Sequence, residues 1–525
     1  MPAIPTMKAA LLLLSLIACT LHAAPLPNFV FILCDDLGYG DVRCLNPEGK
    51  IATPNMDRLA REGMSFTDAH TSSGVCSPTR YGIMTGRYSW RSKLQSGVLG
   101  GLSPRLIEPG RTTVAEMLRA QGYKTGCIGK WHLGMDWVVK PGKTVAELNI
   151  EAPEQAWSVD FTQPAKNGPT SVGFDSYFGI SASLDMVPYC FIENDHVTAQ
   201  PTETMKLVMN KGGPVSYTRE GPGAPGFTGE GVLPAFLHHA EEFIANHKGA
   251  PFFLYMPLTA PHTPIMPNSE WKGKSGLNLY ADFVMETDAV VGRIMAALEK
   301  HDLAENTVLI MTSDNGCSPS ADYPTLLAKG HNPSGSFRGT KADIYEGGHH
   351  VPYLVRWPAQ VRGGQTSTQI ICTTDFMATA AEITGVKLPD TTAEDSISFL
   401  PALLGRKDAP VRQSIIHHSA VGHFAIREGR WKLALCPGSG GWSAPRPGQE
   451  PKDAPRVQLF DLEADIGEKT NLQAQHPEIV ARLTQKLEEL VANGRSTPGE
   501  KQANAVPVDI WKKKGTAKKA KKDGK

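Results

Sequence analysis

The sequence predicts an α/β protein with a large domain, built on a mixed, mostly parallel sheet between helices, and a smaller α+β domain. Short apolar runs along most of the chain give way to polar loops that contain glycine and then to helical patterns, as expected of a largely parallel sheet. After about residue 405 the segments become short and alternating, which favours an antiparallel sheet. The 525 residues exceed a usual single domain, and we expect two.

Five apolar runs in the large domain are expected to form buried strands. They are residues 28–34, 123–128, 252–256, 307–311 and 351–357. Thr53 and Pro54 supply an N-cap and a first-turn proline for a helix that Gly63 ends. A second helix is expected from Thr113 to Ala120, before Gly122.

The domains follow from the change in pattern along the chain. The large domain is expected to span residues 25–405 and the smaller one residues 406–500, with strands at 414–418 and 430–435 and a helix at 477–493. Residues 437–455, rich in Gly, Pro and Ser, predict a long loop. The Lys-rich residues 501–525 predict a disordered tail, with weak binding to an acidic polymer as the alternative.

The first 24 residues have the pattern of an export signal. Lys8 precedes an apolar run that ends at Ala18, and Ala23 and Ala24 offer a cleavage site. Residues 16–19 also resemble a bacterial lipobox, in which Cys19 would be acylated. Both readings predict an exported protein, periplasmic or secreted, and no later segment is apolar for long enough to span a membrane.

Composition indicates a soluble globular chain. Apolar residues make up 41% and charged residues 20%, and 53 basic residues balance 53 acidic ones, so no nucleic-acid partner is expected. The nine cysteines form no CxxC pair, which argues against a zinc ribbon or a dense disulfide framework. The sequence leaves open whether one or two disulfides form.

The first candidate for chemistry is Cys76, in the segment CSPTR at 76–80 that is followed by TGR at 85–87. A loop is expected to turn into a helix here at Pro78. A side chain at such a place lies beside free backbone N–H groups and the positive end of the helix dipole. Alone, the segment also fits a structural thiol.

Oxygen ligands follow two of the expected strands. Asp35 and Asp36 end the first strand, and Asp314 and Asn315 end the strand that begins at Thr307. Open α/β sheets form their sites at these carboxyl ends. Carboxylate and amide oxygens suit Ca²⁺ or Mg²⁺ better than zinc. Each pair alone is also a common turn former.

Lys and His side chains follow other predicted elements. Lys130 and His132 lie in GKWHLG at 129–134, and His262 lies in APHTP at 260–264. Lys341 lies in GTK at 339–341, shortly before EGG at 346–348. Singly, such residues are more often surface groups or satisfied core groups.

Together these segments resemble the formylglycine-dependent sulfatases, a branch of the alkaline phosphatase superfamily. The resemblance rests on residues 76–80 with 85–87 and on 129–134, and it runs from about Pro27 to Leu472. It implies an alkaline phosphatase-like fold and a Cys76 that a formylglycine-generating enzyme oxidises to 3-oxoalanine. In that family one oxygen of the hydrated aldehyde attacks sulfur, and the other drives expulsion of sulfate.

The resemblance also implies a role for each candidate. The ligands of a Ca²⁺, preferred to Mg²⁺, would be Asp35, Asp36, residue 76, Asp314 and Asn315. Arg80 would fix the diol and neutralise charge. Lys130 would bind the sulfate, and His132 would deprotonate the diol's remaining hydroxyl. His262 and Lys341 would bind the sulfate and protonate the leaving alcohol.

A looser match places Ser183 in the sulfate pocket. The family often has His after that serine, where this chain has Leu184, and Arg commonly follows the Gly-Gly at 347–348, where this chain has His349. Residues 459–472 resemble the C-terminal strand-turn motif of the family. Four further polar residues could recognise sugar hydroxyls or form ordinary turns: Asp185, Asn194, Asp195 and His196.

The predicted function is hydrolysis of sulfate esters on carbohydrate. Residues 181–195 look most like those of enzymes for 6-O-sulfated galactose or N-acetylgalactosamine. One alternative is a phosphodiester or phosphonate ester hydrolase that uses the same formylglycine, and another is a non-catalytic binder of sulfated polysaccharide. A single cation is favoured over two zinc ions, because additional Asp and His ligands are not apparent.

Overall fold

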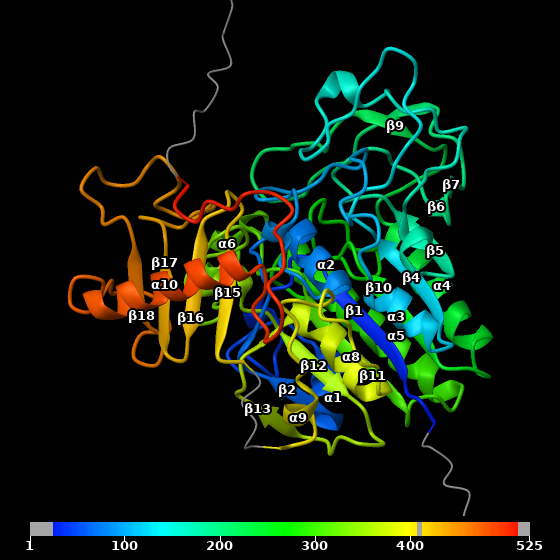
Figure 1. The fold of residues 1–525 in the computed structure, drawn as a ribbon. Helices are drawn as coiled ribbons and strands as arrows, with labels where there is room; N and C mark the ends of the chain where they lie inside the picture. Colours follow the sequence, from blue (N-terminus) through cyan, green and yellow to red (C-terminus); the bar gives the residue numbers. More distant parts are fainter. Residues whose placement is uncertain (1–24, 407–411, 513–525) are drawn as a thin grey trace, which may run out of the picture.

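A mixed ten-stranded sheet is the centre of the large domain in the computed structural model, which describes residues 25–406 and 412–512 (Figure 1). Five neighbouring strands, from β11 to β5 in the order given below, run parallel. At one side β12 runs antiparallel to both of its neighbours, whereas the last two strands there, β2 and β13, pair parallel with each other. At the other side β6 and β7 pair antiparallel. The strand order is β13 (Gln365–Ser367), β2 (Met64–Phe66), β12 (Tyr353–Arg356), β11 (Thr307–Ser313), β1 (Asn28–Cys34), β10 (Phe252–Pro257), β4 (Lys124–Lys130), β5 (Ser176–Ile180), β6 (Ile192–Glu193) and β7 (His196–Val197). The predicted fold class is confirmed, and each predicted strand is present.

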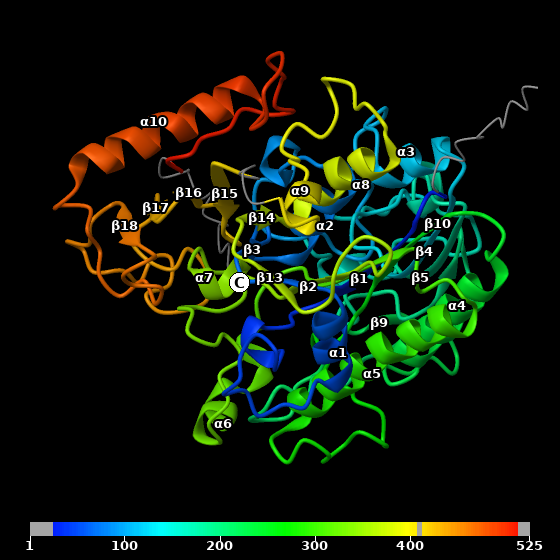
Figure 2. The same ribbon diagram turned by 90° about the horizontal axis from the view of Figure 1, so that it is seen from below.

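Helices cover both faces of this sheet (Figure 2). One face carries α1 (Pro54–Glu62), α4 (Val232–Asn246) and α5 (Leu279–Lys300), and the other carries α2 (Cys76–Thr85), α3 (Val114–Ala120), α8 (Phe376–Thr384) and α9 (Leu400–Leu403). Thr53 stands at the N-cap of α1 as predicted, with Pro54 in the first turn, but its side chain makes no capping hydrogen bond. In α3 the hydroxyl oxygen of Thr113 accepts a hydrogen bond from the Glu116 N–H and caps the helix. Cys76 is the first residue of α2, so the helix predicted from Pro78 begins two residues earlier.

The smaller domain is a four-stranded antiparallel sheet covered by one long helix. Its strands are β15 (Ser414–His418), β16 (Phe424–Glu428), β17 (Trp431–Ala434) and β18 (Gln458–Asp461), and α10 spans Pro477–Asn493 as predicted. Residues 437–455 contain no helix or strand, as predicted. The remaining short elements are β3 (Ala69–His70), β14 (Ile371–Cys372), β8 (Glu203–Met205), β9 (Gly221–Gly223), α6 (Tyr323–Ala328) and α7 (Glu346–His349).

The prediction that residues 501–525 are disordered is wrong for residues 501–512. The Ala503 carbonyl accepts a hydrogen bond from Arg87, the Ala505 N–H donates to the Arg91 carbonyl, and Ile510 is buried against the C-terminal sheet. The sequence missed this because apolar residues are sparse here and their partners lie some 400 residues earlier. Residues 513–525, and the predicted export signal with Cys19, lie outside the described residues.

The eight cysteines within the described residues are all free thiols, so no disulfide joins them. No helix in the described part of the chain is long and apolar enough to cross a membrane.

A buried histidine cluster joins the two domains. His70 Nδ1 lies 3.1 Å from His349 Nδ1, and the rings of His349 and His417 stack with 3.6 Å between centroids. Lys432 Nζ, from β17, lies 3.0 Å from His349 Nε2. Burial lowers the pKa of His70 to about 4 and holds the pKa values of His349 and His417 well below their usual range.

Acid is therefore expected to destabilise the folded protein. A histidine with a folded pKa below its unfolded value of about 6.5 binds a proton more readily when unfolded, so stability is lost as pH falls below about 6.5. For His70 alone the loss is about 3 kcal/mol at pH 4. Urea unfolding at several pH values should show this loss, and His417→Gln should make it shallower, whereas His238→Gln on the exposed face of α4 should not.

Candidate active site

The oxygen-bearing residues meet at the carboxyl ends of β1 and β11. These strands are parallel neighbours, with Cys34 beside Ser313, so the residues that follow them emerge at the same edge of the sheet. Asn315 Nδ2 donates to Asp36 Oδ1 at 2.7 Å. Asp36 adopts the left-handed backbone region, which turns its side chain toward Asn315 and Lys341.

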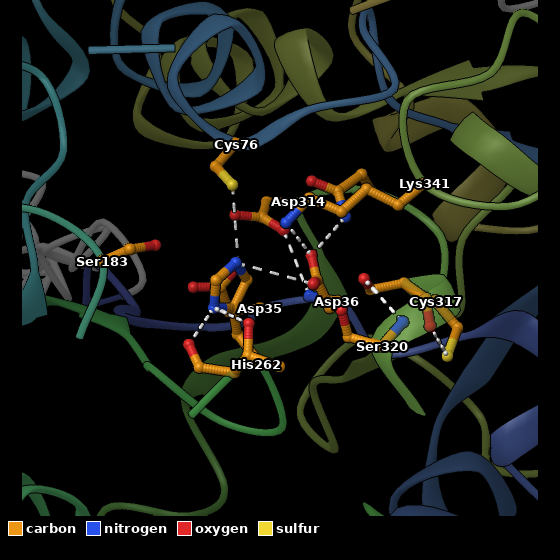
Figure 3. Close-up of polar contacts among 12 residues, drawn as sticks. Asp35, Asp36, Cys76, Ser183, His262, Asp314, Cys317, Ser320 and Lys341 are labelled. Carbon is orange, nitrogen blue, oxygen red and sulfur yellow. Dashed lines mark hydrogen bonds and ion pairs between the residues drawn. The ribbon is translucent and has the colours of Figure 1, made fainter. Parts of the chain in front are cut away.

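Cys76 faces these residues from the start of α2 (Figure 3). Its Sγ lies 3.8 Å from Asp35 Oδ1, and the residue is 2% exposed. Val75, the N-cap, makes no side-chain capping hydrogen bond, so the N–H groups of the first turn are free to face an anion. Burial raises the pKa of the Cys76 thiol to about 12.

Arg80 lies one turn after Cys76 and joins α2 to the carboxyl ends of β11 and β4. Its Nε and Nη2 donate to Asp314 Oδ2 at 3.0 and 2.8 Å, and its Nη1 donates to the Lys130 carbonyl at 2.8 Å. The guanidinium is fully buried. Burial, with the neighbouring Asp35, raises the pKa of Asp314 to about 6 despite this contact.

Lys130 ends β4 and lies between Asp35 and Ser183. Its Nζ donates to Asp35 Oδ2 and, at 2.6 Å, to Ser183 Oγ. Burial alone would raise the pKa of Asp35, but the charges of Lys130 and Arg80 outweigh it and hold that pKa well below its usual range.

Lys341 and His262 approach the other carboxylate, Asp36. Lys341 Nζ lies 2.5 Å from Asp36 Oδ1, and His262 Nε2 lies 3.6 Å from Asp36 Oδ2. His262 Nδ1 faces the Thr263 carbonyl, to which it donates. The side chains of His262 and Lys341 are 10% and 5% exposed, whereas those of Lys130 and Arg80 are fully buried, so the site opens on the His262 and Lys341 side.

His132, two residues after Lys130, has one ring nitrogen without a partner. Its Nε2 lies 2.8 Å from the Leu99 carbonyl, which can only accept, so Nε2 carries the proton and Nδ1 has a lone pair. Nδ1 is buried without a hydrogen-bond partner. The Leu99 N–H in turn donates to Ser77 Oγ, beside Cys76. Burial and the nearby cations hold the pKa of His132 well below its usual range, which keeps the ring neutral.

The donor set fits a hard cation. Asp36 Oδ2 and Asn315 Oδ1 are buried and have no hydrogen-bond donor, as expected of oxygens that bind a cation. One ligand atom from each of Asp35, Asp36, Cys76 and His262 lies within 4.8 Å of the others. When Asp314 and Asn315 are added, four residues offer carboxylate or amide oxygens and two offer nitrogen or sulfur, which favours Ca²⁺ over zinc.

The structure thus brings the predicted residues together, although most are far apart in the sequence. His132 is connected to the others through Leu99 and Ser77, which the sequence analysis did not identify, because a backbone carbonyl leaves no motif.

Of the weaker candidates, Asn194 accepts a hydrogen bond from the Tyr177 N–H and so stabilises the fold, and Asp195 and His196 form an exposed pair. Asp185 keeps one buried carboxylate oxygen without a partner, two residues after Ser183.

Fold and site define a hydrolase for a tetrahedral anionic ester, because a nucleophile position at a helix N-terminus faces a cation site and three buried basic side chains. Comparison with known proteins identifies the ester. The family model described as "Sulfatase" matches residues 27–386, and one described as "N-sulphoglucosamine sulphohydrolase, C-terminal" matches residues 339–438. The chain belongs to the sulfatase family and is a sulfuric ester hydrolase.

Relatives of known activity match this chain over most of their length and support its assignment to the sulfatases. The chain is 34% identical to an N-acetylgalactosamine-6-O-sulfatase of Bacteroides thetaiotaomicron, over 88% of this chain and 92% of that protein. It is 32% identical to human arylsulfatase A, over 88% of this chain and 86% of that protein. A solved structure described under metabolism of multiple glycosaminoglycans by Bacteroides thetaiotaomicron has a TM-score of 0.74 at 33% identity, covering 89% of this chain and 99% of that one.

Proposed function

We propose that the protein removes sulfate from carbohydrate, with a preference for 6-O-sulfated N-acetylgalactosamine or galactose. It would use a formylglycine derived from Cys76 and a bound Ca²⁺, and it would be exported and matured by a formylglycine-generating enzyme. The observation that carries the proposal is the pair of unpartnered oxygens, Asp36 Oδ2 and Asn315 Oδ1, at the edge of the sheet where Cys76 also lies. The N-acetylgalactosamine-6-O-sulfatase relative supports the choice of sugar.

The balance of charges in the site supports both the bound Ca²⁺ and an ionised nucleophile at position 76. Three carboxylates, Asp35, Asp36 and Asp314, each lie against one of three cations, which are Lys130, Lys341 and Arg80. The protein groups are therefore nearly neutral together. A divalent cation would balance the single charge of a sulfate ester and the single charge of an ionised nucleophile, so the loaded site would be neutral again.

The side chains around formylglycine and Ca²⁺ would each have a separate role. The hydrate of formylglycine supplies the attacking oxygen, and Ca²⁺ supplies charge stabilisation next to it. Lys130 and Ser183 would bind one side of the sulfate, and Lys341 the other. His132 Nδ1, with its free lone pair, would accept the proton that is released as the aldehyde re-forms.

His262 would protonate the leaving alcohol. Burial alone would lower the pKa of Lys341, but Asp36 outweighs it and holds that pKa well above its usual range, so Lys341 keeps its proton and acts through its charge. His262 is the other group at the open side of the site, and imidazole is the side chain that most often serves as a general acid. His262→Ala is therefore expected to cost more kcat on saccharides than on aryl sulfates, whose leaving groups need no proton.

A substrate panel tests the proposal. Protein with modified Cys76 is assayed on 4-nitrophenyl sulfate, on bis-4-nitrophenyl phosphate and on defined saccharides sulfated at O2, O3, O4, O6 or N. We expect sulfate release to be fastest from the 6-O-sulfated galactose and N-acetylgalactosamine units. A strong preference for the phosphodiester would overturn the reaction, and fastest release from another position would overturn only the substrate.

A further inference from the structure

The tryptophan at position 442 is an exposed aromatic side chain on the loop of the small domain that contacts the turn containing Lys341. Trp442 is 43% exposed, although an indole is usually largely buried. The residue before it, Gly441, lies against the Ala342 backbone so closely that a Cβ would come within 2.4 Å of the Ala342 carbonyl. The small domain therefore places an indole one residue beyond its contact with the turn that contains Lys341.

One buried carboxylate holds both segments. Asp343 Oδ2 accepts from the Thr340 N–H at 2.8 Å and closes the turn that contains Lys341. Asp343 Oδ1 accepts from the backbone N–H groups of Trp442 and Ser443, at 2.7 and 3.0 Å. The position of Trp442 is thus coupled to that of Lys341 through a single side chain.

The Trp442 loop is also fixed internally. The Trp442 carbonyl accepts from Arg446 Nε at 2.7 Å, and Ser439 Oγ donates to the Ser443 carbonyl at 2.7 Å. The Ile344 N–H donates to the Ser439 carbonyl at 2.8 Å. An aromatic side chain with an anchored backbone loses little conformational entropy when a ligand covers it, because only two side-chain torsions are free.

The leaving group must pass this side of the site. The sulfate end of a substrate would lie among fully buried groups, and the site opens toward His262 and Lys341. An alcohol bound to the sulfate therefore extends past Lys341, the side on which the Trp442 loop contacts the large domain. A pyranose ring has a face of C–H groups, which packs well on the negative face of an indole.

We propose that Trp442 is a specificity-determining residue: the pyranose ring of the leaving sugar stacks on its indole. The proposal rests on the proposed function and deepens it, because it assigns the contact that distinguishes a sugar from other alcohols. It also gives the small domain a role in substrate binding.

The test uses the modified enzyme and the sulfated saccharide that it hydrolyses fastest in the panel above. We expect Trp442→Ala to raise KM about tenfold with a smaller change in kcat, and Trp442→Phe to keep KM within about twofold of wild type. The matched control is Trp431→Ala. Trp431 pairs with Glu428 at the end of the same sheet that lies opposite the loop, so its loss should leave KM unchanged.

The outcomes are distinguishable. A KM for Trp442→Ala within twofold of wild type, or an equal rise in Trp442→Phe, overturns the stacking proposal. A parallel loss of kcat and thermal stability in both variants also overturns it, because it would show that Trp442 only supports the fold. Failure of the wild-type enzyme on 4-nitrophenyl sulfate and on every saccharide would instead refute the proposed function.

Discussion

Protein in which Cys76 is still a thiol is expected to fold but to turn over sulfate esters at least about 10⁴-fold more slowly than modified protein. The Cys76 thiol is buried, and its pKa of about 12 leaves almost no thiolate at neutral pH. A thiol also lacks the second oxygen that would expel sulfate. The measurement compares protein made with and without a formylglycine-generating enzyme, with the modified fraction determined by peptide mass spectrometry.

Two controls make this result interpretable. Cys76→Ser should lack activity under both conditions if the activating enzyme acts on cysteine, and thermal unfolding should show that each preparation is folded. Activity should rise in proportion to the modified fraction. Rapid turnover by protein with a demonstrably unmodified Cys76 would contradict the mechanism.

The sequence was most informative where function depends on short segments at the ends of strands. Asp35 and Asp36, and likewise Asp314 and Asn315, directly follow apolar runs, so their position at one edge of the sheet follows from parallel pairing alone. Cys76 and Arg80 lie one helical turn apart, so both face the same site from a single helix. For these residues the local sequence pattern was sufficient to predict their position in the site.

Contacts between distant loops could not be predicted in the same way. The Leu99 carbonyl fixes the tautomer of His132, and any residue type could supply that carbonyl. Asp343 looks like an ordinary turn residue in the sequence, yet it joins the Lys341 turn to a loop about 100 residues later. Residues 501–512 looked like part of a lysine-rich tail because their partners, Arg87 and Arg91, are only adjacent once the chain has folded.

The site is assembled from both kinds of contact, and this explains its electrostatics. Each of the three carboxylates is paired with a cation from a different part of the chain, so the site can be buried without a large net charge. Two oxygens, Asp36 Oδ2 and Asn315 Oδ1, are left over from this pairing. Burial of these oxygens without a hydrogen-bond donor is unfavourable unless a ligand such as a cation contacts them.

Removal of Ca²⁺ is accordingly expected to reduce both turnover and stability. Chelation should lower kcat/KM at least about 100-fold, because the proposed cation would stabilise charge next to the nucleophile. It should also lower the melting temperature, since a cation present at 100 times its Kd stabilises the folded state by about 2.7 kcal/mol. Differential scanning fluorimetry and metal analysis check this independently of activity.

Asp36→Asn separates a specific site from general ionic effects. This variant keeps the size of the side chain but removes the charge next to Lys341 and His262, so it should lose the Ca²⁺-dependent rise in melting temperature. Glu242→Gln, on the exposed face of α4, removes a carboxylate elsewhere and should keep that rise. Full activity after chelation, or two tightly bound zinc ions per chain, would contradict a single calcium site. Retention of the thermal shift in Asp36→Asn would show that the cation binds elsewhere, because Asp36 provides one of the two unsatisfied buried oxygens on which the proposed cation site rests.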